Sequence, residues 1–206
     1  MSKTYTTTEE RASYGIGHQM GQQLASNPFE GLDVSIVMEG VKHGFEGEAP
    51  SVSNDDLRAA FMEIQSRMEA AKQEQSAGVI EAGEAFLSEN AKKESVTVTE
   101  SGLQYEVVNK GDGATPSAEA TVRVHYHGTL IDGTVFDSSY DRGEPAEFPV
   151  NGVIKGWTEA LQLMSVGDKL RLVIPHDLAY GERGAGGAIG PYNTLVFDVE
   201  LLDILG

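Results

Sequence analysis

The hydrophobic periodicity of the chain changes near residue 95, and this change most limits what the chain can fold into. Before that point apolar residues recur every three or four positions, which is typical of amphipathic helices. After it they alternate with polar residues, which is typical of strands with one buried face. The sequence therefore predicts a helical N-terminal part and a strand-rich C-terminal part within 206 residues.

Two short helices are expected at the start of the helical part. Residues 12–24 carry apolar side chains at every fourth position, and residues 34–45 carry them at spacings of three and four. Gly17 and Gly21 lie inside the first stripe, where glycine is unfavourable. They either let another helix approach closely or mark a break in this one.

A long helix is expected next. Ser53 and Asp56 have the spacing of a capping box, and apolar residues from Leu57 to Ala71 follow in a seven-residue repeat. No proline occurs between Val52 and Thr115, so we expect this helix to continue to about residue 94. The repeat fades near residues 73–76, and beyond it the helix is expected to run through solvent.

The helical stripes need a partner surface, because they are too few to form a core of their own. A second copy of the chain would supply one in a twofold dimer. The alternative is that the helices fold back onto the C-terminal part, and the long solvent-exposed arm makes this the less favoured choice. We therefore expect a dimerisation domain at 1–52, a connecting helix at 53–94 and a separate domain at 95–206.

The C-terminal domain is expected to be of the α+β class. Its alternating segments are residues 103–107, 122–126, 170–174 and 195–201. Between them, Trp157, Ala160, Leu161 and Met164 form one short helical stripe. A single helix packed against an antiparallel sheet buries both apolar faces.

Composition excludes several classes of function. The formal net charge of −17 is spread along the chain and repels nucleic acid and anionic membranes. The absence of cysteine excludes disulfides and thiolate chemistry. No apolar run is long enough to span a membrane, and the polar start does not resemble a signal peptide. We therefore expect a cytoplasmic protein with no nucleic-acid or membrane partner, or a periplasmic one if a leader has been removed.

The sequence contains no recognised nucleophile, phosphate-binding or metal motif. His125 and His127 are two apart on one expected strand, and we interpret them as a solvated pair and not as metal ligands. The glycine-rich residues 181–190 precede a strand and not a helix, so a mobile rim loop is a better interpretation than a phosphate cradle. No metal or cofactor is expected.

Aromatic residues are spread through the C-terminal domain. They are Tyr126, Phe136, Phe148, Trp157, Tyr180 and Phe197. On composition alone, aromatic side chains in a small domain most often fill its core. The alternative is that they line a pocket, and the motifs around them favour this alternative.

Several motifs occur in a fixed order between about Ser101 and Leu205. They are Val124-His125-Tyr126-His127-Gly128, Gly133-Thr134-Val135-Phe136-Asp137-Ser138-Ser139, Arg142-Gly143-Glu144-Pro145, Val153-Ile154-Lys155-Gly156-Trp157, Leu178-Ala179-Tyr180-Gly181 and the run 194–202. Together they resemble the FKBP family of macrolide-binding prolyl isomerases. The segment Ala12-Ser13-Tyr14-Gly15-Ile16-Gly17 looks like the dimeric bacterial branch related to macrophage infectivity potentiators.

The resemblance implies a sheet wrapped on one short helix and a peptidyl-prolyl cis-trans isomerase that acts as a V-shaped homodimer. Its expected partners are partly folded, proline-containing proteins and macrolide inhibitors, and no cofactor is implied. The alternative is a holdase chaperone or a protein-binding scaffold in which isomerisation is incidental.

The resemblance also implies which residues form the site. The proline pocket would be lined by Tyr126, Phe136, Asp137, Val153, Ile154, Trp157, Tyr180 and Phe197. Trp157 would be its floor, and Asp137, Tyr180, Trp157 and Phe136 would be the catalytic residues. Arg142 would hold Asp137 in place, or else form only a surface ion pair.

The sequence departs from the family pattern at the rim of the expected pocket. Ala146 stands where eukaryotic members often have an aromatic residue, and Ala185 and Ala188 stand where larger side chains often pack on ligand. Gly190-Pro191 replaces a common Pro-Pro. We expect a barer rim, which bears on macrolide affinity and substrate preference more than on catalysis.

Such a pocket would act without a nucleophile or proton relay. A twisted prolyl amide is less dipolar than the planar amide, so an apolar site favours it. We expect the backbone N–H of Ile154 and the hydroxyl of Tyr180 to orient the substrate carbonyls. Asp137 would act electrostatically and not as a general base.

Overall fold

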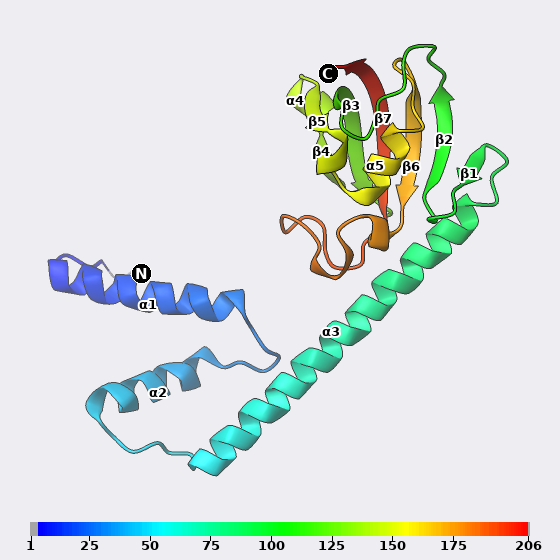
Figure 1. Ribbon diagram of the computed structural model, residues 1–206. Helices are drawn as coiled ribbons and strands as arrows, with labels where there is room; N and C mark the ends of the chain where they lie inside the picture. Colours follow the sequence, from blue (N-terminus) through cyan, green and yellow to red (C-terminus); the bar gives the residue numbers. More distant parts are fainter. Residues whose placement is uncertain (1–3, 206) are drawn as a thin grey trace. The chain divides into compact units, whose positions relative to one another are not determined.

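The computed structural model describes residues 4–205. Residues 1–3 of the expected dimerisation domain and residue 206 of the expected C-terminal domain lie outside the described residues. The chain divides into two compact units, Met1–Lys72 and Gln73–Gly206, and the boundary falls inside the long helix. The elements (Figure 1) are α1 Thr8–Ser26, α2 Val34–Glu46, α3 Asn54–Asn90, β1 Val96–Val98, β2 Gln104–Asn109, β3 Thr121–Leu130, β4 Val135–Ser138, α4 Ser139–Arg142, β5 Ala146–Pro149, η1 Val150–Gly152, α5 Lys155–Leu161, β6 Lys169–Ile174, η2 His176–Leu178, η3 Gly181–Arg183 and β7 Leu195–Ile204.

The helices of the first unit begin at side-chain caps. The Glu10 N–H donates to Thr7 Oγ1 (3.1 Å), and the Thr7 N–H donates to Glu10 Oε2 (3.2 Å). This capping box starts α1 four residues before the expected position. Asp33 caps α2, which ends at Gly47 in the left-handed region with φ 74°.

The apolar stripes of the first unit remain exposed. No residue of α1 or α2 is buried, and Phe45 and Phe61 are 92% and 70% exposed. Patches of this kind usually mark an interaction surface. Within residues 4–205, no helix has both the length and the apolar character that crossing a membrane requires.

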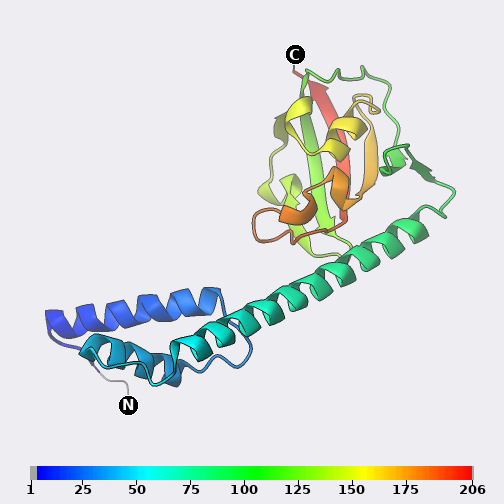
Figure 2. The ribbon, with the colours of Figure 1, turned by 60° about the horizontal axis from the view of Figure 1, so that its bottom comes forward.

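The second unit is built around an antiparallel sheet, and the predicted α+β class is confirmed. The strand order is β1-β2-β6-β7-β3-β4, with β5 pairing with β3. The long strands β3 and β7 form its centre, and α5 packs against one face (Figure 2). Alternation on β3 buries Val122, Val124 and Tyr126 against α5 and leaves the intervening residues partly exposed.

The second half of α3 belongs to the sheet unit. Ser53 caps the helix as predicted, since its Oγ accepts from the Asp56 N–H (3.1 Å). The expectation that the helix runs through solvent beyond residue 73 is wrong. Its half-buried or buried residues recur on one face at Ser76, Val79, Ile80, Gly83, Phe86, Leu87 and Asn90. The stripe was missed because it includes Ser76, Gly83 and Asn90, which are not apolar.

Candidate functional site

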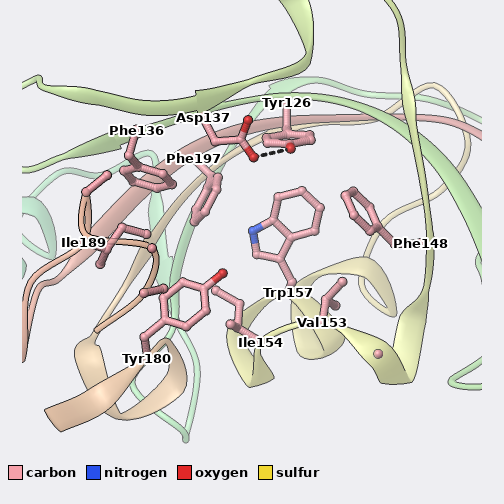
Figure 3. A pocket seen from close by; sticks show the side chains of 14 residues that line it. Tyr126, Phe136, Asp137, Phe148, Val153, Ile154, Trp157, Tyr180, Ile189 and Phe197 are labelled. Atoms are coloured by element: carbon pink, nitrogen blue, oxygen red, sulfur yellow. Dashed lines mark hydrogen bonds between the residues drawn. The ribbon is translucent and has the colours of Figure 1, made fainter. Parts of the chain in front are cut away.

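A pocket of about 650 Å³ opens in the sheet unit (Figure 3). Its volume is in the usual range for small-ligand sites. The lining residues are Tyr126, Phe136, Asp137, Phe148, Gly152, Val153, Ile154, Trp157, Tyr180, Ala185, Gly186, Ala188, Ile189 and Phe197. All eight residues that the sequence predicted for a proline pocket are among them, and their individual roles stay predictions.

The floor of the pocket is Trp157 in the first turn of α5. The helix can lie this close to the sheet because residue 156 is glycine. A Cβ on Gly156 would lie 2.5 Å from Ile174 Cγ2 on β6. The close approach brings the indole against Tyr126 on β3 and Phe197 on β7.

Aromatic rings surround the indole edge to face. Trp157 makes T-shaped contacts with Tyr126, Phe148 and Phe197 at centroid distances of 5.3, 5.8 and 5.2 Å. Phe136 packs on Phe197 in the same way at 5.3 Å. These arrangements suit the ring quadrupoles and hold each ring in one orientation.

The indole belongs to both the core and the pocket. Trp157 is only 4% exposed and packs within the hydrophobic cluster, yet it lines the cavity. Its Nε1–H is buried and has no hydrogen-bond partner among the described residues. A buried donor without a partner is uncommon. The floor therefore combines an apolar ring surface with one indole N–H that no protein group within residues 4–205 accepts.

One wall of the pocket is polar. The Tyr126 hydroxyl donates to Asp137 Oδ2 (2.5 Å), and Arg142 Nη2 donates to the Tyr126 hydroxyl (2.8 Å). Arg142 Nη1 also donates to Asp137 Oδ1. The expected pairing of Arg142 with Asp137 is present, and Tyr126 closes it into a three-residue network.

This network sets the ionisation of its members. Partial burial alone would raise the pKa of Asp137, but the hydrogen bonds from Tyr126 and Arg142, with the Arg142 charge, lower it below its ordinary value. Burial and the Asp137 hydrogen bond raise the pKa of the Tyr126 hydroxyl. At neutral pH the wall thus presents a fixed carboxylate and a neutral phenol.

Two further donors near the pocket have no protein acceptor among the described residues. The Ile154 N–H precedes α5 and makes no hydrogen bond there. The Tyr180 hydroxyl makes none within residues 4–205 either. Tyr180 is 40% exposed, and its ring projects toward the cavity (Figure 3). Both groups are free to donate to a ligand.

The rim is formed by the glycine-rich segment after η3. Ala185 and Ile189 exchange two backbone hydrogen bonds of 2.8 and 3.0 Å. Gly184 has φ 62°, and a Cβ there would lie 2.2 Å from the Ile189 carbonyl oxygen. The segment is therefore a backbone-bonded turn that places Ala185, Gly186, Ala188 and Ile189 at the pocket.

Sequence reasoning left several lining residues out of the predicted site. Phe148 is among the aromatic residues of the domain but not among the predicted lining residues, yet it contacts the indole. Its alternation with Ala146 on a strand paired with β3 was the signal. Ile189 and Gly152 carried no comparable signal, because they reach the pocket only through turns.

The histidine pair lies outside the pocket. His125 Nδ1 is 2.9 Å from Ser139 Oγ, and its ring stacks on Tyr140 at 4.6 Å. No group of three or more potential metal ligands occurs within residues 4–205. Nothing in the described part of the chain thus makes the pair part of a metal centre.

Family models match most of the sequence. One described as "FKBP-type peptidyl-prolyl cis-trans isomerase" matches residues 113–202. Another, "Domain amino terminal to FKBP-type peptidyl-prolyl isomerase", matches residues 9–107. The amino-terminal model covers the helices and the first two strands, and the isomerase model covers most of the remaining sheet unit.

Characterised relatives are similar over nearly the whole chain. An Escherichia coli (strain K12) protein named "FKBP-type 22 kDa peptidyl-prolyl cis-trans isomerase" is 55% identical over 202 residues, 98% of each chain. "Outer membrane protein MIP" of Legionella longbeachae is 39% identical over 97% of this chain and 87% of its own. The crystal structure of FkpA from Escherichia coli superposes with a TM-score of 0.72 at 36% identity, covering 98% of both chains.

Proposed function

Because the chain belongs to the FKBP family of peptidyl-prolyl cis-trans isomerases, we propose that the pocket floored by Trp157 is where a prolyl peptide bond is twisted. The chain is a peptidyl-prolyl cis-trans isomerase by this membership. One observation supports the location most strongly. The indole is almost wholly buried, yet it forms the base of an open cavity of about 650 Å³.

Resonance explains why such a pocket is sufficient. It gives the peptide C–N bond partial double-bond character and a rotation barrier of about 18–20 kcal/mol. At the transition state the amide is twisted and its carbonyl is less dipolar. An apolar, water-poor cavity destabilises the planar amide relative to the twisted one. No bond to the protein forms, so no nucleophile is required.

The polar groups of the pocket orient the substrate. The free Ile154 N–H and Tyr180 hydroxyl donate to carbonyl oxygens on either side of the prolyl bond. Asp137 faces the twisted amide as a fixed negative charge, held by Tyr126 and Arg142. Its lowered pKa makes it a poor proton acceptor, which supports an electrostatic role.

A tetrapeptide isomerisation assay tests this function. The protein should accelerate cis-to-trans relaxation of a proline tetrapeptide well beyond the uncatalysed rate, which has a time scale of tens of seconds or longer. A macrolide inhibitor should abolish the acceleration by filling the pocket. Folded protein that leaves the relaxation unchanged would overturn the proposal. A holdase or scaffold role alone would not need this pocket.

The small side chains at the rim bear on ligand affinity. Ala185 and Ala188 line the pocket and provide little surface for a macrolide to contact. We expect macrolides to bind more weakly than to members with larger residues there. Titration of the Trp157 fluorescence measures this affinity, because Trp157 is the only tryptophan.

The helical unit supports assembly into a homodimer. Ile16, Phe45 and Phe61 lie on amphipathic stripes that the described chain leaves exposed. A second copy would cover these stripes across a twofold axis. The division into a dimerisation domain, a connecting helix and an isomerase domain is part of this proposal. Two catalytic units in one dimer would hold a partly folded protein at two points and raise its effective concentration.

Deleting residues 1–50 separates catalysis from assembly. The shortened chain should sediment as a monomer, keep kcat/KM on a tetrapeptide, and refold a proline-limited protein more slowly than the full chain. Equal refolding rates would contradict the two-point model. The expected location, cytoplasmic or else periplasmic if a leader has been removed, stays a prediction, and cell fractionation distinguishes the two.

A further inference from the structure

The second half of α3 lies against the isomerase sheet. Asn90 Nδ2 donates to Gln104 Oε1 (2.9 Å), and Gln104 Nε2 donates to the Leu87 carbonyl (3.0 Å). Both side chains are buried. These bonds fasten the end of α3 to the first residue of β2.

The outer face of the sheet is apolar and buried beside this contact. Gln104 pairs with Val173 on β6, and Val173 pairs with Val196 on β7. Val173 and Val196 are buried but do not belong to the main cluster around Trp157. They point to the opposite face because side chains alternate along a strand. The half-buried stripe of α3 therefore covers this row.

One turn earlier, α3 meets the start of β7. A Cβ on Gly83 would lie 2.6 Å from Thr194 Oγ1 and 3.4 Å from Thr194 Cβ. Thr194 is 2% exposed, so it has little space to move into. Its β-branched side chain also has few allowed rotamers. Glycine at position 83 is thus required for the observed position of Thr194.

Thr194 follows the rim of the pocket, residues 184–190, along the chain. Ile189, a lining residue, precedes it by five positions, and the intervening chain is tightly held. The Tyr192 N–H donates to the Gly181 carbonyl (2.8 Å), and Tyr192 has φ 60°, which is unfavourable for a residue with a side chain. A displacement of Thr194 would therefore be passed to the rim and not absorbed by slack chain.

We propose that Gly83 is a positioning residue for the proline pocket, setting the rim formed by residues 184–190 through its contact with Thr194. The proposal rests on the pocket being the isomerase site. In this proposal the second half of α3 holds the rim of the binding site in position. Any substitution that lifts α3 from Thr194 changes substrate affinity without touching the substrate.

The test compares three variants of the full chain. Gly83→Ala adds the methyl group that collides with Thr194. Gly83→Ala/Thr194→Ala removes Oγ1 and leaves the 3.4 Å separation from Cβ, an ordinary contact. Gly78→Ala is the matched control, because it lies on the same helix with nothing within 4 Å of its Cβ.

We expect Gly83→Ala to raise KM for a proline tetrapeptide about tenfold with little change in kcat. In free energy, a tenfold change lies at the lower end of the measured costs of overpacking a protein core. The Trp157 emission spectrum should shift with it, since Trp157 is the only tryptophan and lies in the pocket. The double variant should restore both readouts, and Gly78→Ala should match the unmodified chain.

Three outcomes would overturn the proposal. They are a Gly83→Ala variant with unchanged KM and emission, a folded double variant that keeps the raised KM, and a Gly78→Ala variant with the same defect as Gly83→Ala. A failure of the proposed function gives a different result from a failure of this proposal. In that case the unmodified chain would show no isomerisation, while the Trp157 emission of Gly83→Ala would still shift because the rim moves.

Discussion

Replacing Trp157 with alanine tests the central claim, that an apolar floor stabilises the twisted amide. The substitution removes the ring on which we propose that the substrate proline rests, and it opens the base of the cavity. It also removes three edge-to-face contacts, with Tyr126, Phe148 and Phe197. Activity and stability should both fall, so the two effects must be estimated and measured separately.

The loss of activity follows from the surface of a proline ring. The ring has three methylene groups, and burying each is worth about 0.8 kcal/mol. The indole covers one of its two faces, so about half of this, about 1.2 kcal/mol, disappears. We therefore expect kcat/KM to fall by about tenfold. Admission of water to the floor would add to this loss.

The loss of stability should be larger. Truncating a buried tryptophan to alanine typically lowers the free energy of unfolding by about 3–5 kcal/mol. Domains of this size are stable by about 5–15 kcal/mol, so the variant should stay folded at low temperature. Urea unfolding followed by circular dichroism measures this change.

Leu161→Ala supplies the control for stability. Leu161 lies one turn further along α5 and is 1% exposed, but it does not line the pocket. Its truncation should lower stability by about 2–5 kcal/mol and leave kcat/KM on a tetrapeptide unchanged. The reasoning is refuted if both variants lose activity equally, or if folded Trp157→Ala keeps full activity.

Three further perturbations have definite expected results. Asp137→Asn keeps an acceptor for Tyr126 but removes the charge, so kcat/KM should fall about tenfold. This is less than the cost of removing a buried oxyanion-hole donor, which is about 10²–10³-fold, because the Asp137 side chain is 44% exposed and its charge is screened by solvent; an unchanged tetrapeptide rate would remove Asp137 from the mechanism. Arg142→Gln should raise the pKa of Asp137, which folding normally lowers from 3.8. The stability that Asp137 contributes is complete above its ordinary pKa and is lost as the pH falls through its folded-state pKa. In the Arg142→Gln variant that pKa is higher, so the loss of stability should begin at higher pH. The acidic limb of the kcat/KM profile should move in the same direction. Gln104→Leu leaves Asn90 and the Leu87 carbonyl without their partner and should lower the free energy of unfolding by about 1–3 kcal/mol, as measured by urea denaturation.

Local pattern was sufficient to predict most of the elements. The stripes of α1, α2 and α3 and the alternation in β2, β3, β6 and β7 each follow from which residues must face an apolar surface. The cap at Ser53 was predicted for the same local reason. The short strands β1, β4 and β5 were not predicted, because three or four residues are too few to show a period.

The motif order likewise predicted the residues that line the pocket. It did so by resemblance, since nothing in their spacing alone separates a pocket from an ordinary aromatic core. The sequence placed the boundary of the expected isomerase domain after residue 94, and that division stays a prediction. The compact units of the structure meet within α3, between Lys72 and Gln73.

By itself, the sequence determined the helical and strand-rich parts and the absence of thiol chemistry, because these depend on residue type and short-range period. Only the tertiary structure decided how Tyr126, Asp137 and Arg142 join in one network, how Trp157 is both buried and accessible from the cavity, and why Gly83 lies against Thr194. These features depend on strand order and on close approach between segments far apart in the chain, and neither is encoded in any local pattern.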